Sequence, residues 1–314
     1  MLGRRGGLMR VLDRLPAWTT TGVGSLPFAD PAEAAAHATG AYGLPFCPQL
    51  PRLEGDMISE WLGADPGRCG WSPGRDRERP RAWDAFVAEL RRWPARHRLV
   101  KLQVTGPATL ACALEREAGG RPSRSAALDL AGEIARWLAA NAAGQVARLA
   151  DLNLDAVLVI DEPALAVFGT DGVEGAWEPL RSAAPAWGLH LCCHVPWDVV
   201  ERAGPDLLSF DLALDRIDDE AGAALRLLAD RGAWIAWGAL RVASTERAGD
   251  ARRRVGEALA AIEIDPARSL LTASCGSGRV SPGREREIAA ELRRATRSGR
   301  GIAPSDRAPS RFTA

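Results

Sequence analysis

Short apolar runs alternate with longer amphipathic stretches along most of this chain. Eight of the apolar runs are typical of buried strands, and they cover residues 21–27, 45–51, 99–107, 156–163, 189–195, 207–214, 234–240 and 269–276. The segments between most of them carry helix-forming patterns, for example 125–152 and 218–232. Several of these segments begin with an Asp or Ser cap, or with Pro in the first turn.

Eight strands with intervening helices predict an α/β fold, a single (β/α)8 TIM barrel, which we expect to span residues 1–300. A doubly wound open sheet is the alternative, but no Gly-x-Gly-x-x-Gly follows the first strand. Residues 301–314 are polar and rich in Pro and Ser, which predicts a disordered C-terminal tail. The segment from Gly63 to Pro80 has a similar composition and is predicted to be a mobile insertion.

Charge and composition narrow the possible partners and the compartment. Lys plus Arg and Asp plus Glu both number 40, so zero net charge argues against nucleic acid or an acidic membrane surface as the main partner. No apolar run is long enough to cross a bilayer, and the N-terminus lacks the apolar core of a signal peptide. The six cysteines lack the spacing of a disulfide framework and predict free thiols or metal ligands, in the cytoplasm.

Unusual residues gather in the stretch "GLHLCCHVPWD". Two of the four histidines and two of the six cysteines fall between His190 and His194. Side chains alternate along a strand, so His190, Cys192 and His194 share one face, and Cys193 points the other way as a small buried hydrophobe. The first three side chains could act as metal ligands at the mouth of a barrel.

Other polar residues are expected at the same mouth, because barrel enzymes place their chemistry at the C-terminal ends of strands. Ser25, Asp161, Asp211 and Cys275 all lie at or near such ends. Zinc takes about four N, S or O donors in a tetrahedral arrangement. Asp211 and Cys275 could complete a zinc site with the His-x-Cys pair, although buried cysteines also pack without binding anything.

Taken together, these motifs resemble the C-terminal catalytic barrel of the cobalamin-independent methionine synthase family, within the uroporphyrinogen decarboxylase and methionine synthase-like superfamily. The resemblance covers nearly the whole chain. It rests on five short motifs in the same order: "VGSLP" at 23–27, "TGPAT" at 105–109, "VIDEPAL" at 159–165, "HLC" at 190–192 and "SCG" at 274–276.

The resemblance implies a zinc ion held by His190, Cys192 and Cys275. The family's fourth protein ligand is a Glu on the next strand, where this chain has Asp211, which is shorter by one methylene. Asp211 is the expected fourth ligand, and His194 is its competitor.

The resemblance also implies that Asp161 binds the ammonium group of the substrate and that Ser25 meets its carboxylate. Glu54, in "LEGDMI", is similar in place to a substrate-binding Glu of the family.

The expected function is therefore zinc-dependent transfer of a methyl group to a thiol, homocysteine giving methionine, as in methionine biosynthesis. Zinc coordination deprotonates a thiol, and the thiolate is the nucleophile. The chain is similar to single-barrel core forms and has no room for a second barrel that binds folate. The methyl donor is then open: a folate, a corrinoid or another methylated molecule. A corrinoid protein is the expected partner if the donor is a corrinoid. The alternatives are a uroporphyrinogen decarboxylase-like barrel, a corrinoid-linked thiol methyltransferase and a non-catalytic binding barrel.

Overall fold

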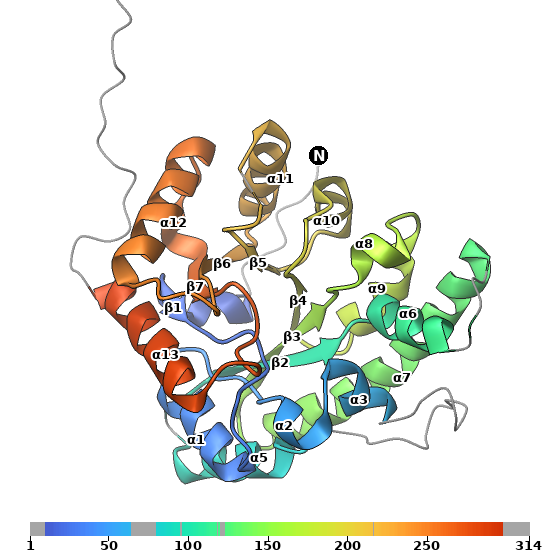
Figure 1. Ribbon diagram of the computed structural model, residues 1–314, viewed down its shortest axis with the longest axis horizontal. Helices are drawn as coiled ribbons and strands as arrows, with labels where there is room; N and C mark the ends of the chain where they lie inside the picture. Colours follow the sequence, from blue (N-terminus) through green and yellow to red (C-terminus); the bar gives the residue numbers. More distant parts are fainter. Residues whose placement is uncertain are drawn as a thin grey trace, which may run out of the picture.

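The computed structural model describes residues 10–63, 80–94, 96–117, 119, 123–215 and 217–297. One sheet of seven strands, all parallel, curls with helices around its outer side (Figure 1). Its order is β1-β7-β6-β5-β4-β3-β2. The strands are β1 (Thr19–Thr20), β2 (Leu99–Thr105), β3 (Asp155–Asp161), β4 (Ala186–Leu191), β5 (Leu207–Asp211), β6 (Trp234–Leu240) and β7 (Ser269–Ala273).

The prediction of a closed barrel of eight regular strands is wrong, because the described residues form a sheet of seven strands. Residues 45–51 were expected to form the second strand, but they carry only isolated bridges, at Phe46 and Gln49. This segment still lies between the two edge strands: Leu44 N donates to Thr20 O at 3.0 Å, and Cys47 N donates to Lys101 O at 3.1 Å. Pro45, Pro48 and Pro51 lack the N–H groups that a continuous ladder needs, which explains the irregular backbone.

Two buried polar side chains of β2 support this irregular region from inside. Lys101 Nζ donates to the carbonyl of Val23, and the Gln103 amide donates to the carbonyl of Cys47. Buried carbonyls without a ladder partner need such donors. The first predicted strand is also displaced, because β1 ends at Thr20 and residues 21–27 contribute only a bridge at Ser25.

Helices cover the outer face of the sheet, as the sequence predicted. They are α1 (Pro31–Gly40), α2 (Pro51–Glu54), α3 (Met57–Leu62), α5 (Trp83–Arg92), α6 (Pro107–Glu117), α7 (Arg124–Ala150), α8 (Leu165–Phe168), α9 (Val173–Arg181), α10 (Trp197–Ala203), α11 (Asp219–Asp230), α12 (Ala248–Ile262) and α13 (Pro282–Arg297), with short 3-10 helices at Val11–Arg14 and Pro266–Arg268. Side chains cap several of them, including Asp30 on α1, Ser123 on α7 and Asp218 on α11. Within the part of the chain that is described, no helix combines the length and the apolar character needed to cross a bilayer.

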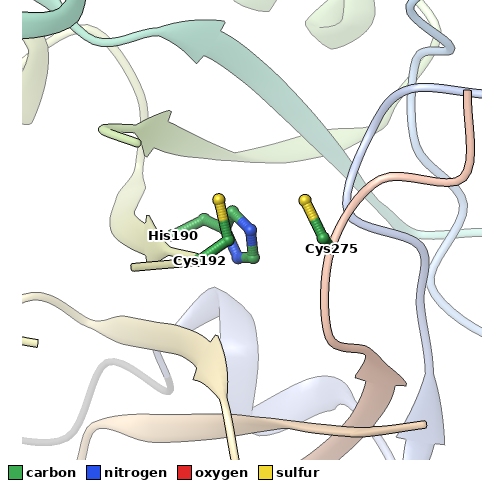
Figure 2. Close-up of side chains that lie close together, drawn as sticks. All are labelled: His190, Cys192 and Cys275. Carbon is green, nitrogen blue, oxygen red and sulfur yellow. The ribbon is translucent and has the colours of Figure 1, made fainter. Parts of the chain in front are cut away.

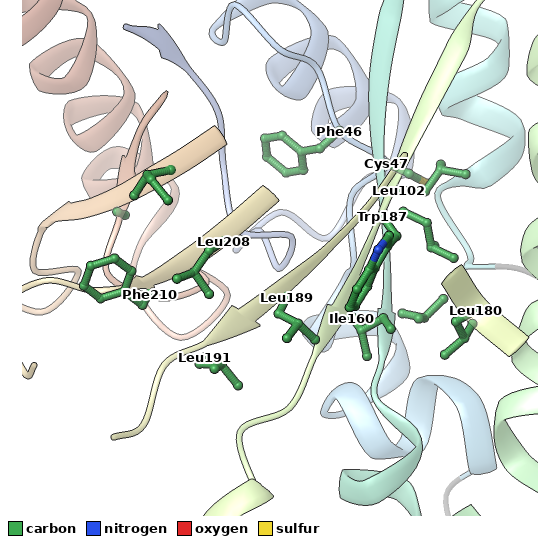
Figure 3. Close-up of a cluster of buried hydrophobic side chains, with 14 of the residues drawn as sticks. Phe46, Cys47, Leu102, Ile160, Leu180, Trp187, Leu189, Leu191, Leu208 and Phe210 are labelled. Carbon is green, nitrogen blue, oxygen red and sulfur yellow. The ribbon is translucent and has the colours of Figure 1, made fainter. Parts of the chain in front are cut away.

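The two faces of the strands bury different kinds of residue. The outer face packs against the helices through side chains such as Leu102, Ile160, Leu189 and Phe210 (Figure 3). Near the amino ends of the strands, the inner face carries a smaller apolar cluster. It includes Leu99, Val157, Ala186, Leu207 and Trp234, and Leu12 of the first 3-10 helix packs among them.

Toward the carboxyl ends of the strands, the same inner face becomes polar. Side chains alternate, so Asp161 shares its face with Val157, His190 shares its face with Ala186, and Ser209 shares its face with Leu207. All three polar side chains are buried. Buried polar groups at one end of an apolar interior mark the place where the fold can hold a ligand.

Two predictions lie outside the residues that the structure describes. These are the disordered tail 301–314 and the central part, residues 64–79, of the mobile insertion.

Candidate metal centre

Three potential metal ligands meet at the carboxyl end of the sheet. The ligand atoms of His190, Cys192 and Cys275 all lie within 4.8 Å of one another. His190 is the penultimate residue of β4, Cys192 follows the end of that strand, and Cys275 faces them from the loop after β7 (Figure 2). Parallel strands end at the same edge, which brings together residues that are 85 positions apart in the sequence (190 to 275).

The His190 ring has one partnered and one unpartnered nitrogen. Nδ1 lies 2.9 Å from Ser209 Oγ on the neighbouring strand. Nε2 is buried and makes no hydrogen bond of normal geometry within the described residues. A buried ring nitrogen without a partner is costly unless something else, such as a metal ion, takes its lone pair.

The two thiols influence each other strongly. A hydrogen bond with Cys192 lowers the pKa of Cys275 to about 4, although burial acts against it, and the nearby His190 ring adds to the lowering. The same hydrogen bond, together with burial, raises the pKa of Cys192. The pair therefore shares its protons unequally, and Cys275 is the sulfur that is present as thiolate, the form in which cysteine binds metals.

This donor set fits zinc. Zn–S bonds of about 2.3 Å and Zn–N bonds of about 2.0–2.1 Å place tetrahedral donors roughly 3.5–3.8 Å apart. The three ligand atoms of this group already lie within 4.8 Å of one another, so small side-chain rotations would bring them to that spacing. One nitrogen and two sulfur atoms are also the donor types that zinc sites use most.

His194 does not join this group, which corrects the expectation of three residues on one strand face. β4 ends at Leu191, so the alternation of faces stops before residue 194. The His194 side chain is 80% exposed, and its Nδ1 lies 3.3 Å from Asp215 Oδ1.

Asp211 also lies outside the group of three. It ends β5, and its Oδ1 accepts hydrogen bonds from the backbone N–H of Ala213 at 2.8 Å and of Leu214 at 3.3 Å. Burial raises the pKa of Asp211, and the nearby Cys275 adds to the effect. Asp211 is thus close to the cluster but turned to its own loop, and its part as a zinc ligand stays a prediction.

The proposed ammonium-binding residue, Asp161, lies beside the cluster. It is the register partner of His190 on the adjacent strand β3, and it is 3% exposed. Burial raises the pKa of Asp161 to about 6, against the opposing influence of His190 and Lys101. Its Oδ1 has no hydrogen-bond partner among the described residues.

Ser25 lies in the segment between β1 and α1, and it is hydrogen-bonded to the loop that carries Cys275. Its carbonyl accepts from Ser277 N at 2.9 Å, and its Oγ accepts from Gly278 N at 3.4 Å. A side chain at Gly276 would place its Cβ 2.0 Å from Ser25 Oγ, so only glycine allows this close approach. The backbone of Glu54 ends α2, whereas its side chain lies outside the described part of the structure.

The fold is similar to those of known methyl-transferring proteins. A B12-independent methionine synthase from Shewanella sp. W3-18-1, in complex with selenomethionine, aligns with a TM-score of 0.50 and 19% identity over 67% of this chain and 65% of that chain. A methyltransferase from Methanosarcina mazei aligns with a TM-score of 0.57 and 15% identity over 90% of this chain and 94% of that chain.

This chain shares its fold with these two proteins. At these identities the likeness concerns the fold, and it agrees with the resemblance seen in the sequence motifs. No protein-family model matches the chain, and no curated protein sequence matches it.

The sequence motifs did not point to Ser209, the hydrogen-bond partner of His190. Ser209 lies two residues before Asp211, so the same alternation that placed Asp211 at the mouth also placed Ser209 on the inner face. That signal was available, but only the register of β4 against β5 pairs Ser209 with His190.

Glu162 was also missed, although it lies in the "VIDEPAL" motif. Its fully buried carboxylate accepts hydrogen bonds from Ala108 N at 3.0 Å, from Thr109 N at 2.8 Å and from Trp177 Nε1 at 3.0 Å. Thr109 Oγ1 donates a further bond at 2.6 Å. Glu162 thus ties the loop after β3 to the first turn of α6, next to Asp161. Gly106, within the "TGPAT" run, leaves room for this carboxylate, because a Cβ there would lie 2.0 Å from Glu162 Cδ.

Proposed function

We propose that this protein is a zinc-dependent methyltransferase that moves a methyl group to a thiol, with homocysteine as the substrate and methionine as the product. The observation that carries the proposal is the group of His190, Cys192 and Cys275 at the carboxyl end of the sheet. The fold shared with a methionine synthase and with a methyltransferase supports it.

A zinc ion in this site would lower the pKa of a bound substrate thiol, so that its sulfur is present as the nucleophilic thiolate at neutral pH. His190, Cys192 and Cys275 would hold the ion, with Asp211 as the proposed fourth protein ligand. Two cysteine thiolates and a carboxylate make the site electron-rich, which suits attack on a methyl carbon better than hydrolysis.

The remaining residues would position an amino acid. Asp161 offers an unpartnered carboxylate oxygen in a buried place, which suits a substrate ammonium group. Ser25 is proposed to bind the substrate carboxylate, and Glu54 remains a proposed third contact.

The methyl donor is proposed to be a corrinoid, free or carried by a partner protein, rather than a polyglutamyl folate. Lys101 is the only lysine of the chain, and it is 3% exposed with its ammonium group bonded to the carbonyl of Val23. Its ammonium group is therefore not available at the surface to bind the polyglutamate tail of a folate. We place the protein in the cytoplasm, because the Cys192 and Cys275 thiols need a reducing compartment.

The test combines metal content with product analysis. Purified protein is assayed for zinc and then incubated with homocysteine and methylcobalamin, and methionine is measured by mass spectrometry. We expect about one zinc per chain, as one four-donor site requires, and methionine formation that stops after chelation and returns on adding zinc. Methionine formation that is indifferent to chelation, or none with zinc bound, would contradict the proposal. Zinc-free protein that decarboxylates a porphyrinogen would favour the decarboxylase alternative.

A further inference from the structure

His190 and Ser209 form a cross-strand pair inside the sheet. They are register partners on β4 and β5, and both are buried, with 3% and 7% exposed. His190 Nδ1 lies 2.9 Å from Ser209 Oγ. Because both residues belong to central strands of the sheet, the backbone ladder fixes their separation, and the ring cannot turn away without losing its partner.

A neutral histidine binds a metal through a nitrogen that carries no proton. The unpartnered nitrogen, Nε2, is the one available to the cysteine pair, so the ring proton must then sit on Nδ1. Ser209 Oγ is in place to accept that proton in a hydrogen bond. We propose that Ser209 is a positioning residue that fixes the orientation and the protonated nitrogen of His190 for metal binding. This inference rests on the zinc site of the proposed function.

The chemistry of the partner matters as well. Metal-bound histidines usually donate to a carboxylate, a backbone carbonyl or water. Here the partner is a neutral hydroxyl, in an interior that already holds the Asp161 carboxyl and two thiols. A second carboxylate at position 209 would add another buried negative charge, which is unfavourable without a cation beside it. A hydroxyl orients the ring without that penalty.

The chain offers a matched control. Thr272 of β7 is also a buried hydroxyl residue, it shares the inner face with Leu270, and its Oγ1 has no partner among the described residues. Thr272→Val removes a buried hydroxyl from the same interior while keeping the shape of the side chain. This variant tests whether zinc binding is disturbed by loss of any buried hydroxyl on the inner face, or only by loss of the Ser209 hydroxyl beside His190.

The experiment measures zinc affinity by competition with a chromophoric chelator in wild type, Ser209→Ala, Ser209→Thr and Thr272→Val. We expect Ser209→Ala to weaken zinc binding by about 10- to 100-fold, as for other partners of metal-bound histidines. Ser209→Thr keeps a hydroxyl and should recover most of the affinity, and Thr272→Val should match wild type. Thermal unfolding of the metal-free proteins checks that all four are folded.

A second readout reports the ring directly. The chain has four histidines, so long-range ¹H–¹⁵N spectra contain few ring signals, and a His190→Gln variant assigns the relevant one. In the zinc-loaded wild type we expect the proton on Nδ1. Zinc binding that Ser209→Ala leaves unchanged, or a zinc-loaded His190 with its proton on Nε2, would overturn the inference alone. A folded wild type that takes up no zinc would instead overturn the proposed function and the inference with it.

Discussion

Asp161 and His190 are register partners at the carboxyl ends of β3 and β4, so a buried carboxyl and a candidate metal ligand lie side by side. One oxygen of this carboxyl has no hydrogen-bond partner within the described part of the chain, and burial raises the pKa of Asp161 to about 6. A buried carboxylate without a hydrogen-bond partner destabilises the folded protein when it is charged. Such groups are typical of functional sites.

Asp161→Asn should therefore stabilise the metal-free protein at neutral pH while abolishing methyl transfer. The folded pKa lies above the unfolded value, so the stability contributed by the protonated form is present below about pH 4 and is lost as the pH rises through about 6. We expect the variant to gain roughly 1–3 kcal/mol over wild type at pH 8 and little at pH 4. Urea unfolding at both pH values measures this, with the exposed Asp129→Asn as control. A gain that is equal at the two pH values would contradict the assignment.

Single replacement of His190, Cys192 or Cys275 by Ala should remove zinc from the purified protein. Each change removes one of the three grouped donors, so the remaining ligands hold zinc much more weakly. Inductively coupled plasma analysis of untagged protein measures the content. Cys112→Ala, which changes a free cysteine outside the group, is the control. Full zinc in all three variants would show that the site is elsewhere.

Asp211→Asn should weaken zinc binding, whereas His194→Ala should leave it unchanged. The Asn side chain keeps an oxygen for the N–H groups of Ala213 and Leu214, so the variant separates loss of the carboxylate from loss of the loop contacts. The absorption spectrum of the cobalt-substituted protein measures whether a ligand is lost in each variant. Unchanged affinity in Asp211→Asn would mean that Asp211 only supports its loop, and that the fourth position belongs to the substrate.

Glu162→Ala should destabilise the protein by about 3 kcal/mol or more, because it leaves the buried N–H groups of Ala108, Thr109 and Trp177 without an acceptor. Urea unfolding measures the free energy. Glu162→Gln, which keeps one acceptor oxygen, should lose less, and the exposed Glu133→Ala should lose almost nothing. Similar stability of Glu162→Ala and Glu133→Ala would refute this structural part for the buried carboxylate.

Methyl transfer to homocysteine should be faster from methylcobalamin, or from a methylated corrinoid protein, than from methyltetrahydropteroyl-triglutamate. The only lysine, Lys101, is buried and bonded to Val23, so it cannot bind the polyglutamate tail. Initial rates measured side by side with equal donor concentrations compare the two. Efficient turnover with the folate at low micromolar concentration would sink this prediction.

The sequence alone determined the repeating units of the fold, because the period of apolar residues along a strand or a helix is a local property. β6 occupies the predicted range, Trp234–Leu240, and β2, β3, β5 and β7 begin within one residue of the predicted starts. The motifs also named the three residues of the metal group. The prolines at 45, 48 and 51 were visible in the sequence, but the apolar run around them suggested a regular strand.

The tertiary structure decided what depends on pairing between distant segments. Where β4 stops, at Leu191, determines that Cys192 stays with His190 and that His194 turns to solvent beside Asp215. The register of β4 against β5 pairs His190 with Ser209, and the common edge of the parallel strands brings Cys275 to Cys192. A one-residue shift of register would turn each of these side chains to the other face of the sheet, and no local pattern in the sequence specifies that register.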